Sequence, residues 1–348
     1  MASERSIKVG GVQIGGGAPV VVQSMTLTKT HDVEATTAQI AALASAGCEV
    51  VRVAVPKSED ADALSKLVRL SPIPVIADIH FNASLALRAI EAGVAAVRIN
   101  PGNIGGPDKV AQVVRAAKAA GMPMRIGANS GSLPKHLSEL AQRDQAEALV
   151  EAALEEVRLL ESLDYYDFKI SVKSSHVPTM IRAYRLLASK VPYPLHLGVT
   201  EAGTPYSGSI KSAVGMGALL ADGIGDTLRV SLTADPVEEV RAGFEILKAL
   251  GLRERGPVMI ACPSCGRDNV GVLRLRHGDT NDLAAGGDEC GDLRSRRLDV
   301  VRLRQRHRLD DDRRAAADLN TADRYRVLAG HGVMLAAPIG AELSSGRR

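Results

Sequence analysis

The sequence predicts an α/β fold, a parallel (β/α)8 barrel of the TIM type followed by a smaller second module. Short runs rich in β-branched residues alternate eight times with helix-forming stretches, and parallel neighbours in a sheet need such crossovers. A barrel of this kind takes about 250 residues, so a chain of 348 residues has room for more. We expect the barrel over residues 1–255 and the second module over residues 256–348.

The elements of the barrel can be placed in chain order. The expected strands end at residues 25, 55, 80, 100, 129, 173, 201 and 232. The expected helices span residues 34–46, 59–70, 83–92, 107–120, 138–163, 176–190, 207–221 and 236–250. Helix starts are indicated at Asn82 or Ser84 and at Asp235-Pro236, and helix ends at four glycines, namely Gly47, Gly93, Gly121 and Gly251.

A hairpin is expected before the first barrel strand. Residues 7–14, IKVGGVQI, place Gly10 and Gly11 between two short alternating runs, which is the pattern of a tight β-turn between paired strands. We expect this hairpin to plug the amino-terminal end of the barrel.

Composition excludes several classes of function. Aromatic residues make up 3% of the chain, with no Trp, which argues against a base-stacking surface for nucleic acid. The net charge of +3 is small for a nonspecific binder of polyanions. The N-terminus has no apolar signal region, and no stretch approaches about 18 apolar residues. We therefore expect a cytoplasmic protein with no nucleic-acid or membrane partner.

The strand ends carry many basic and amide side chains. Barrels of this type hold their chemistry at the carboxyl ends of the strands, and the guanidinium group donates two parallel hydrogen bonds to phosphate. The candidate ligands for a phosphorylated substrate are Arg52, Arg98, Asn100, Arg125, Asn129, Lys173, Arg229 and Ser231. For any one arginine, an ion pair inside the barrel is the alternative.

Three residues at the same strand ends are candidates for acid–base chemistry. Asp78 and Glu201 offer carboxylates that can accept or orient a proton of a hydroxylated substrate, and His80 titrates near neutral pH. The alternative for Asp78 is that it pairs with a neighbouring arginine. The other histidines that we considered have no metal-ligand spacing, and we expect them to be ordinary loop or core residues; they are His31, His136, His176 and His196.

A CxxC motif opens the second module. Cys262 and Cys265 stand in CPSCG, a turn that brings two thiolates to one metal or cluster. The possibilities are iron–sulfur ligation, half of a zinc ribbon and a dithiol redox pair; a zinc ribbon needs a second CxxC, which the sequence lacks. Cys48 lies beside a core strand and is expected to be buried. Cys290 is the remaining candidate for a third metal ligand.

The composition changes after about residue 270. Residues 271–348 contain 15 Arg and no Lys, whereas residues 1–270 contain 16 Arg and 12 Lys. Two explanations compete: a divergent and partly disordered segment, or translation of a GC-rich gene out of frame. We favour the second, and resequencing the gene separates them.

Several of these motifs resemble one known family. The resemblance covers about residues 6–268 and rests on KVGGVQIGGGAPVVVQSMT, ADIHFN, VRINPGNIG, RIGANSGSL, KISVKSS, HLGVTEAG, GIGDTLRVSLT and ACPSCGR, in that order. The chain is similar to the 4-hydroxy-3-methylbut-2-enyl diphosphate synthases, iron–sulfur enzymes of the methylerythritol phosphate route to isoprenoids. Such long motifs in a fixed order are highly specific.

The resemblance implies an activity and a set of partners. It implies a reductive ring opening and dehydroxylation of 2-C-methyl-D-erythritol 2,4-cyclodiphosphate, with flavodoxin or ferredoxin as electron donor and a [4Fe-4S] cluster. It also implies a head-to-tail homodimer in which the cluster domain of one subunit closes the barrel of the other.

The resemblance further assigns roles to residues. The eight candidate ligands named above would hold the diphosphate, Asp78 and Glu201 would face the hydroxyl-bearing carbons, and Cys262 and Cys265 would bind iron. The family pattern for the third Cys and a ligating Glu does not occur after Arg267. The alternatives are therefore a barrel that binds a phosphorylated ligand but is catalytically inactive for lack of a complete cluster site, and a pterin- or phosphate-binding transferase without redox chemistry.

Overall fold

The structure is a computed structural model of the chain. It describes residues 3–79, 82–100, 104–255, 258–261, 325–330 and 333–338, the last three ranges as backbone. The chain divides into two units, Met1–Glu254 and Arg255–Arg348. Among the described residues, no helix has the length and apolar composition needed to cross a membrane.

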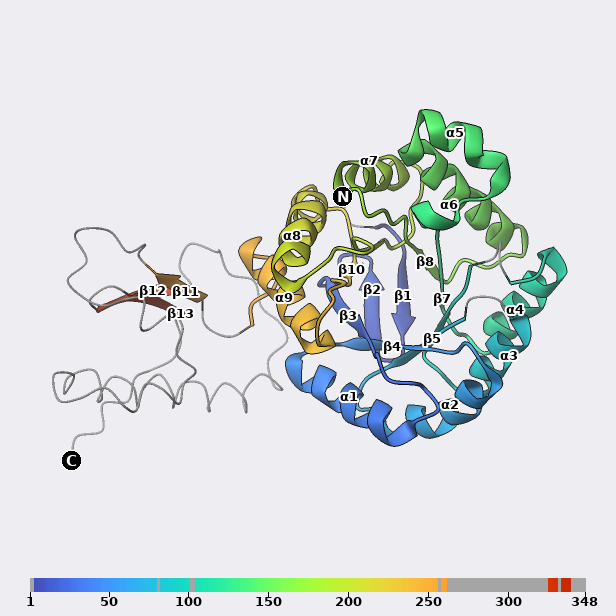
Figure 1. The fold of residues 1–348 in the computed structure, drawn as a ribbon, viewed down its shortest axis with the longest axis horizontal. Coiled ribbons are helices and arrows are strands. Elements are labelled where there is room, and N and C mark those ends of the chain that lie inside the picture. Colours follow the sequence, from blue (N-terminus) through green and yellow to red (C-terminus); the bar gives the residue numbers. More distant parts are fainter. Residues whose placement is uncertain are drawn as a thin grey trace. The chain divides into compact units, whose positions relative to one another are not determined.

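The first unit is a parallel barrel with helices around it, as predicted (Figure 1). Its wall consists of β3 (Val21–Met25), β4 (Val50–Ala54), β5 (Val75–Asp78), β6 (Ala96–Arg98), β7 (Met124–Ile126), β8 (Phe168–Ile170), β9 (His196–Leu197) and β10 (Thr227–Leu228). The strand order is β8-β7-β6-β5-β4-β3-β10-β9. A bridge between Ile170 and Leu195 brings the two outer strands of this order together and completes the ring.

The outer helices follow the predicted ranges closely. They are α1 (Val33–Ala46), α2 (Ser58–Leu70), α3 (Ala83–Glu91), α4 (Pro107–Ala119), α5 (Ser138–Arg143), α6 (Gln145–Ser162), α7 (Val177–Ala188), α8 (Pro205–Ala221) and α9 (Pro236–Ala249). Asn82 and Asp235 cap α3 and α9 by accepting the N–H groups of Ser84 and Val237. All four glycines predicted to end helices have positive φ.

One predicted helix is two helices in the structure. Residues 138–163 were expected to be continuous, but Asp144 has extended backbone (φ −151°) between α5 and α6. Its side chain accepts the N–H of Glu147 at 3.1 Å and pairs with Arg182. A carboxylate that caps a new helix start offsets the hydrogen bonds lost at the break, which the apolar periodicity alone does not indicate.

A hairpin plugs the amino-terminal end of the barrel, as expected. β1 (Ser6–Val9) pairs antiparallel with β2 (Val12–Gly15), and Figure 1 shows both strands inside the ring. Their buried side chains pack on residues at the starts of four barrel strands, forming one apolar cluster: Ile7, Val9, Ile14, Val21, Val50, Ile76 and Ala96. A separate, larger cluster fills the layer between strands and helices.

The described part of the second unit is a three-stranded antiparallel sheet. β13 (Val333–Pro338) lies between β11 (Val258–Ala261) and β12 (Tyr325–Gly330). The apolar run at β11 is evident in the sequence, but neither of the other strands was predicted. The assignment of this unit to an iron–sulfur domain stays a prediction.

Candidate active site

The polar residues of the barrel interior lie two residues further along the strands than the residues that contact the hairpin. Side chains on a strand alternate between its two faces. Val51, Ala77 and Val97 belong to the cluster under the helices, while Val50, Ile76 and Ala96 meet the hairpin. Arg52, Asp78 and Arg98 have the same parity as the second set, two residues further on. They therefore face the barrel interior toward its carboxyl end.

Asp78 joins two of the predicted arginines. Its Oδ2 lies 3.2 Å from Nε of Arg52, and its Oδ1 lies 3.0 Å from Nη1 of Arg98. All three residues are buried. Burial is the main cause that lowers the pKa of Arg52 to about 10, and Asp78 opposes this shift. The ion pairs fit the alternative role of Asp78 as a partner of arginine; its contact with substrate stays a prediction.

Arg229 is held by a carboxylate from the helix that follows it. Its Nε and Nη2 lie 3.3 and 3.4 Å from the carboxylate oxygens of Glu239 on α9. Glu239 is buried and also accepts from Ser24 Oγ and from the N–H of Leu232. Sequence reasoning missed Glu239, although a glutamate on the inner face of an amphipathic helix is a signal for a buried partner.

A methionine completes the contacts between two arginines. The thioether of Met25, at the end of β3, accepts from Arg52 Nη2 at 3.1 Å and from Arg229 Nη1 at 3.7 Å. Sulfur is a weak acceptor, so these guanidinium groups keep much of their capacity to donate to a stronger acceptor. Met25 was also missed, because nothing in its local pattern separates it from an ordinary core residue.

Arg125 and Lys173 are basic side chains without a carboxylate partner among the described residues. Arg125 donates to Ser171 Oγ through Nε at 3.2 Å and Nη2 at 2.6 Å, and its buried Nη1 has no partner there. Burial, with neighbouring arginines second, lowers the pKa of both Arg125 and Lys173 well below the ordinary value. A guanidinium group stays protonated in proteins, so Arg125 is a buried cation whose interactions are incomplete.

The remaining predicted residues lie directly after barrel strands. Asn100 is buried two residues after Arg98, and Ser231 is half-buried two residues after Arg229. Asn129 is half-buried and forms a parallel bridge with Lys173. Glu201 is exposed after β9, with a left-handed φ of 52°. A non-glycine residue in this conformation is strained, as residues at functional sites often are.

A deeper layer of polar groups lies under the arginines. Lys169 on β8 is fully buried, lies in register with Arg125, and donates to Gln23 Oε1 at 3.4 Å. Burial, with Arg125 second, lowers its pKa to about 7. His196 is also fully buried, and burial followed by Arg125 lowers its pKa well below the usual range. The sequence did not predict a role for Lys169, because it lies within β8 and not at the carboxyl end of that strand.

Several predicted residues lie outside the described ranges. They are His80, Cys262, Cys265 and Cys290. Cys48 lies within them and is buried, as expected, with Sγ donating to the carbonyl of Val50 at 3.1 Å. Burial raises the pKa of its thiol to about 12, so Cys48 is an unreactive core thiol.

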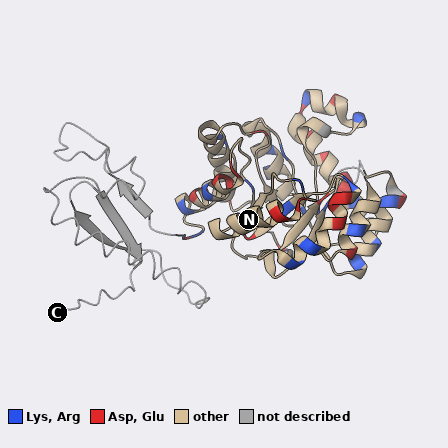
Figure 2. Ribbon diagram, turned by 60° about the horizontal axis from the view of Figure 1, so that its bottom comes forward, with Lys and Arg blue, Asp and Glu red and all other residues tan. Residues whose placement is uncertain are grey.

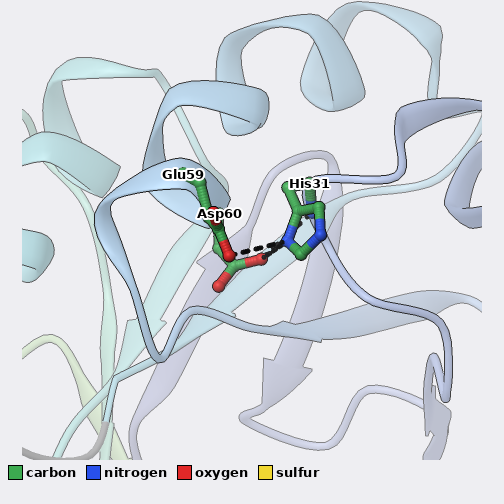
Figure 3. A group of neighbouring side chains, drawn as sticks. All are labelled: His31, Glu59 and Asp60. Atoms are coloured by element: carbon green, nitrogen blue, oxygen red, sulfur yellow. Dashed lines mark hydrogen bonds and ion pairs between the residues drawn. The ribbon is translucent and has the colours of Figure 1, made fainter.

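His31 has two acidic neighbours that the sequence did not suggest. Figure 3 shows its ring beside Glu59 and Asp60 at the start of α2, with Nδ1 3.4 and 2.9 Å from their carboxylates. The three residues come close enough to share a metal ion. However, Asp60 already accepts the N–H groups of His31 and Lys57. Through these hydrogen bonds Asp60 connects the segment around His31, which precedes α1, to the start of α2. The cluster therefore has a structural role.

The outer surface contrasts with the barrel interior. Figure 2 shows basic and acidic residues interspersed along the outer helices, and many form exposed pairs such as Arg241–Glu238 and Arg185–Asp222. Among the described residues at the carboxyl ends of the strands, five basic side chains meet two carboxylates: Arg52, Arg98, Arg125, Lys173 and Arg229 against Asp78 and Glu239. The site is suited to a compact ligand with several negative charges.

Comparisons with known proteins agree with this fold. Residues 4–244 match the family profile described as the GcpE TIM-barrel domain. Among solved structures, sialic acid synthetase from Leptospira borgpetersenii aligns with 82% of this chain and 99% of its own at TM-score 0.52 and 14% identity. Dihydropteroate synthase from Stenotrophomonas maltophilia aligns with 67% and 92% at TM-score 0.51 and 17% identity. At such identities the likeness concerns the fold alone.

The relatives in sequence are much closer. The protein from Geobacter sulfurreducens named 4-hydroxy-3-methylbut-2-en-1-yl diphosphate synthase (flavodoxin) is 58% identical over 272 residues, which are 78% of this chain and 77% of that one. The protein of the same name from Parafrankia sp. is 56% identical over 283 residues, 81% of this chain and 73% of that one. The chain therefore belongs to the family of the GcpE-type 4-hydroxy-3-methylbut-2-en-1-yl diphosphate synthases.

Proposed function

We propose that this chain catalyses the reductive ring opening and dehydroxylation of 2-C-methyl-D-erythritol 2,4-cyclodiphosphate to 4-hydroxy-3-methylbut-2-enyl diphosphate, in the non-mevalonate route to isoprenoids. The observation that carries the proposal is the excess of buried cations at the carboxyl end of the barrel. Family membership indicates the reaction, since relatives at 56% and 58% identity bear the name of this synthase.

In this proposal the basic residues bind and orient the diphosphate. Arg125 and Lys173, which lack a carboxylate partner among the described residues, are the strongest donors to it. Arg52, Arg98 and Arg229 are held in place by Asp78 and Glu239. Fixed donors bind an anion without the entropy cost of ordering long side chains.

The loop residues complete the substrate site. Asn100, Asn129 and Ser231 would hydrogen-bond the diphosphate, while Asp78 and Glu201 would face the hydroxyl-bearing carbons. Glu201 is exposed on the loop after β9, so its carboxylate is accessible to a ligand. In these roles Asp78 or Glu201 would hold or move a proton at a carboxylate oxygen.

The proposal includes a [4Fe-4S] cluster with Cys262 and Cys265 as ligands and Cys290 as a further candidate. Such a cluster supplies electrons and a Lewis-acidic iron. Flavodoxin is the proposed electron donor, because it is named for the relatives, with ferredoxin as the other choice. We further propose a homodimer acting in the cytoplasm.

Anaerobic reconstitution of the full chain tests the function. We expect about four iron atoms per chain and turnover of the cyclodiphosphate with reduced flavodoxin. Cys262→Ser should lower the iron content and leave substrate binding intact, whereas Arg98→Met should weaken substrate binding and leave the cluster spectrum unchanged. A chain that binds the cyclodiphosphate but holds no iron would contradict the proposal and favour the inactive binding protein.

A further inference from the structure

A half-buried glutamate outside the predicted site contacts the loop that leaves β7. Glu156 lies on the inner side of α6, and its Oε2 accepts the backbone N–H of Gly127 at 2.7 Å. Gly127 begins the loop that leads from Arg125 to Asn129. A helix side chain therefore holds the backbone between two proposed ligands of the diphosphate.

The backbone at Gly127 has little freedom to move. Its φ is 141°, and a Cβ at this position would lie 1.9 Å from the carbonyl oxygen of Ser171. The loop also receives hydrogen bonds from β8 and its extension, where the N–H of Lys173 donates to Ala128 at 3.0 Å. Glu156 holds the loop from the helix side, opposite these strand contacts.

The same short segment positions the side chain of Arg125. The guanidinium group donates to Ser171 Oγ at 2.6 Å, and Ser171 is the residue against which Gly127 packs. A shift of Gly127 would therefore change the distance between Arg125 and Ser171, and with it the aim of the donor groups. Displacements of about 1 Å are enough to weaken a preorganised site strongly.

We propose that Glu156 is a positioning residue of the anion site, holding Gly127 so that Arg125 and the loop after β7 present their donors to the diphosphate. This inference rests on the proposed function and adds to it a residue that does not touch the ligand. Glu156 acts through the backbone, since its hydrogen bond is to an N–H group and not to a guanidinium group.

The charge state of Glu156 gives the proposal a signature in pH. The groups that influence it are Gly127 N–H, Arg98 and Arg125 from the strands, and Glu155 from its own helix. Burial is the largest influence and raises the pKa of Glu156 to about 8. The group is thus a neutral acid at pH 7 and becomes a carboxylate near two arginines as the pH rises to 9, where it opposes binding of an anion.

Calorimetric titration of the full chain with inorganic pyrophosphate tests the inference. At pH 7, Glu156→Ala should bind at least tenfold more weakly than the unmodified chain, because the N–H of Gly127 loses its acceptor. Glu156→Gln keeps an acceptor oxygen and should stay within about threefold. The matched control is Glu155→Ala, on the preceding residue of α6, which contacts His136 at the surface and should leave affinity within about twofold.

The pH profile separates positioning from a general loss of structure. Between pH 7 and 9 the unmodified chain should lose at least threefold more affinity than Glu156→Gln, which cannot ionise. Equal affinity of Glu156→Ala and Glu155→Ala, or the same pH profile in Glu156→Gln and the unmodified chain, would overturn the inference.

A second readout works without any ligand. Amide hydrogen exchange over residues 124–133 should be faster in Glu156→Ala than in Glu155→Ala, because the loop is released from α6. If the unmodified chain fails to bind pyrophosphate, the anion site of the proposed function is wrong. Unchanged exchange would show instead that Glu156 does not hold the loop.

Discussion

The two ends of the barrel are built from the same strands but differ in chemistry. Val50, Ile76 and Ala96 meet the apolar hairpin, and two residues later on the same strands stand Arg52, Asp78 and Arg98. A strand rises about 3.3 Å per residue, so the interior changes from apolar to ionic over about 7 Å. The amino end supplies stability through burial, and the carboxyl end holds charges that are costly to bury.

This contrast suggests that stability and binding can be changed separately. A substitution in the plug should lower the free energy of unfolding and leave the affinity of the folded protein for anions intact. A substitution of an unpaired cation should do the opposite. Four substitutions, placed from the plug to the loop after β9, test whether stability and binding change separately. A result that differs from the one expected would count against this division.

The largest effect is expected from the plug. Ile14 on β2 is fully buried, and Ile14→Ala should lower the free energy of unfolding by about 2–5 kcal/mol through lost burial and a residual cavity. Urea unfolding measures this loss. Ile210→Ala on α8, where the side chain is 48% exposed, is the control and should change stability by less than about 0.5 kcal/mol. Weaker pyrophosphate binding by folded Ile14→Ala would show that the two ends are coupled.

The next effect concerns affinity at the other end. Arg125→Met should weaken pyrophosphate binding by about 30-fold, since one charge-assisted contact contributes about 2 kcal/mol. The same change should leave the free energy of unfolding unchanged or raise it, because a buried cation with an unpartnered Nη1 is removed. Arg158→Met on α6, a side chain 58% exposed, is the control. A marked loss of stability in Arg125→Met would contradict the division between the ends.

The hairpin at the amino end and the arginines at the carboxyl end could both be predicted from the sequence. Period-two patterns and glycines are local signals, so the hairpin of residues 7–14 and the barrel strands could be placed without tertiary contacts. Parallel strands bring their carboxyl ends together, so Arg52, Arg98 and Arg125 could be grouped from their positions along the chain. The fold follows from local pattern plus one rule of topology.

The supporting residues could not be predicted in this way. Glu239 and Glu156 reach the site from helices, and Met25 lies between arginines of different strands. Their roles depend on which helix face packs on which strand, a property of tertiary packing. The break at Asp144 was missed for a related reason, because its capping contacts compete with a continuous apolar stripe.

The third prediction concerns Lys169 and the dependence of the free energy of unfolding on pH. The pKa of Lys169 is about 7 in the folded chain against an ordinary 10.5. Between these values the unfolded chain binds a proton that the folded chain does not, so the free energy of unfolding rises with pH from 7 toward 10.5. The cost of the buried charge is fully present below pH 7. Lys169 should contribute up to about 1.4 kcal/mol per pH unit.

Lys169→Met should remove that contribution to the slope. Urea unfolding at pH 7 and pH 9 compares the variant with the unmodified chain and with Lys118→Met, a surface lysine paired with Asp164. Lys118→Met should keep the slope of the unmodified chain in this interval. If Lys169→Met also kept the full slope, Lys169 would be charged throughout, and the deeper layer would need an anionic partner.

The smallest effect is expected at Glu201, where strain and proposed function coincide. Its φ of 52° costs about 1–2 kcal/mol in a non-glycine residue, and glycine relieves this strain while adding about 0.5–1 kcal/mol of backbone entropy cost. Glu201→Gly should therefore raise the free energy of unfolding by about 0.5 kcal/mol, whereas Glu201→Ala should not. Both variants remove the carboxylate, so both should lose turnover of the cyclodiphosphate.

Asp164 provides the matched control for this strain. It has the same φ of 52° in the turn between α6 and β8, on the amino-terminal side of that strand, and Asp164→Gly should keep turnover. Aspartate tolerates left-handed backbone better than glutamate, so its gain in stability should be smaller still. Full turnover in Glu201→Gly would remove Glu201 from the proposed catalytic residues. The strained backbone after β9 would then be a feature of the loop structure and would have no role in catalysis.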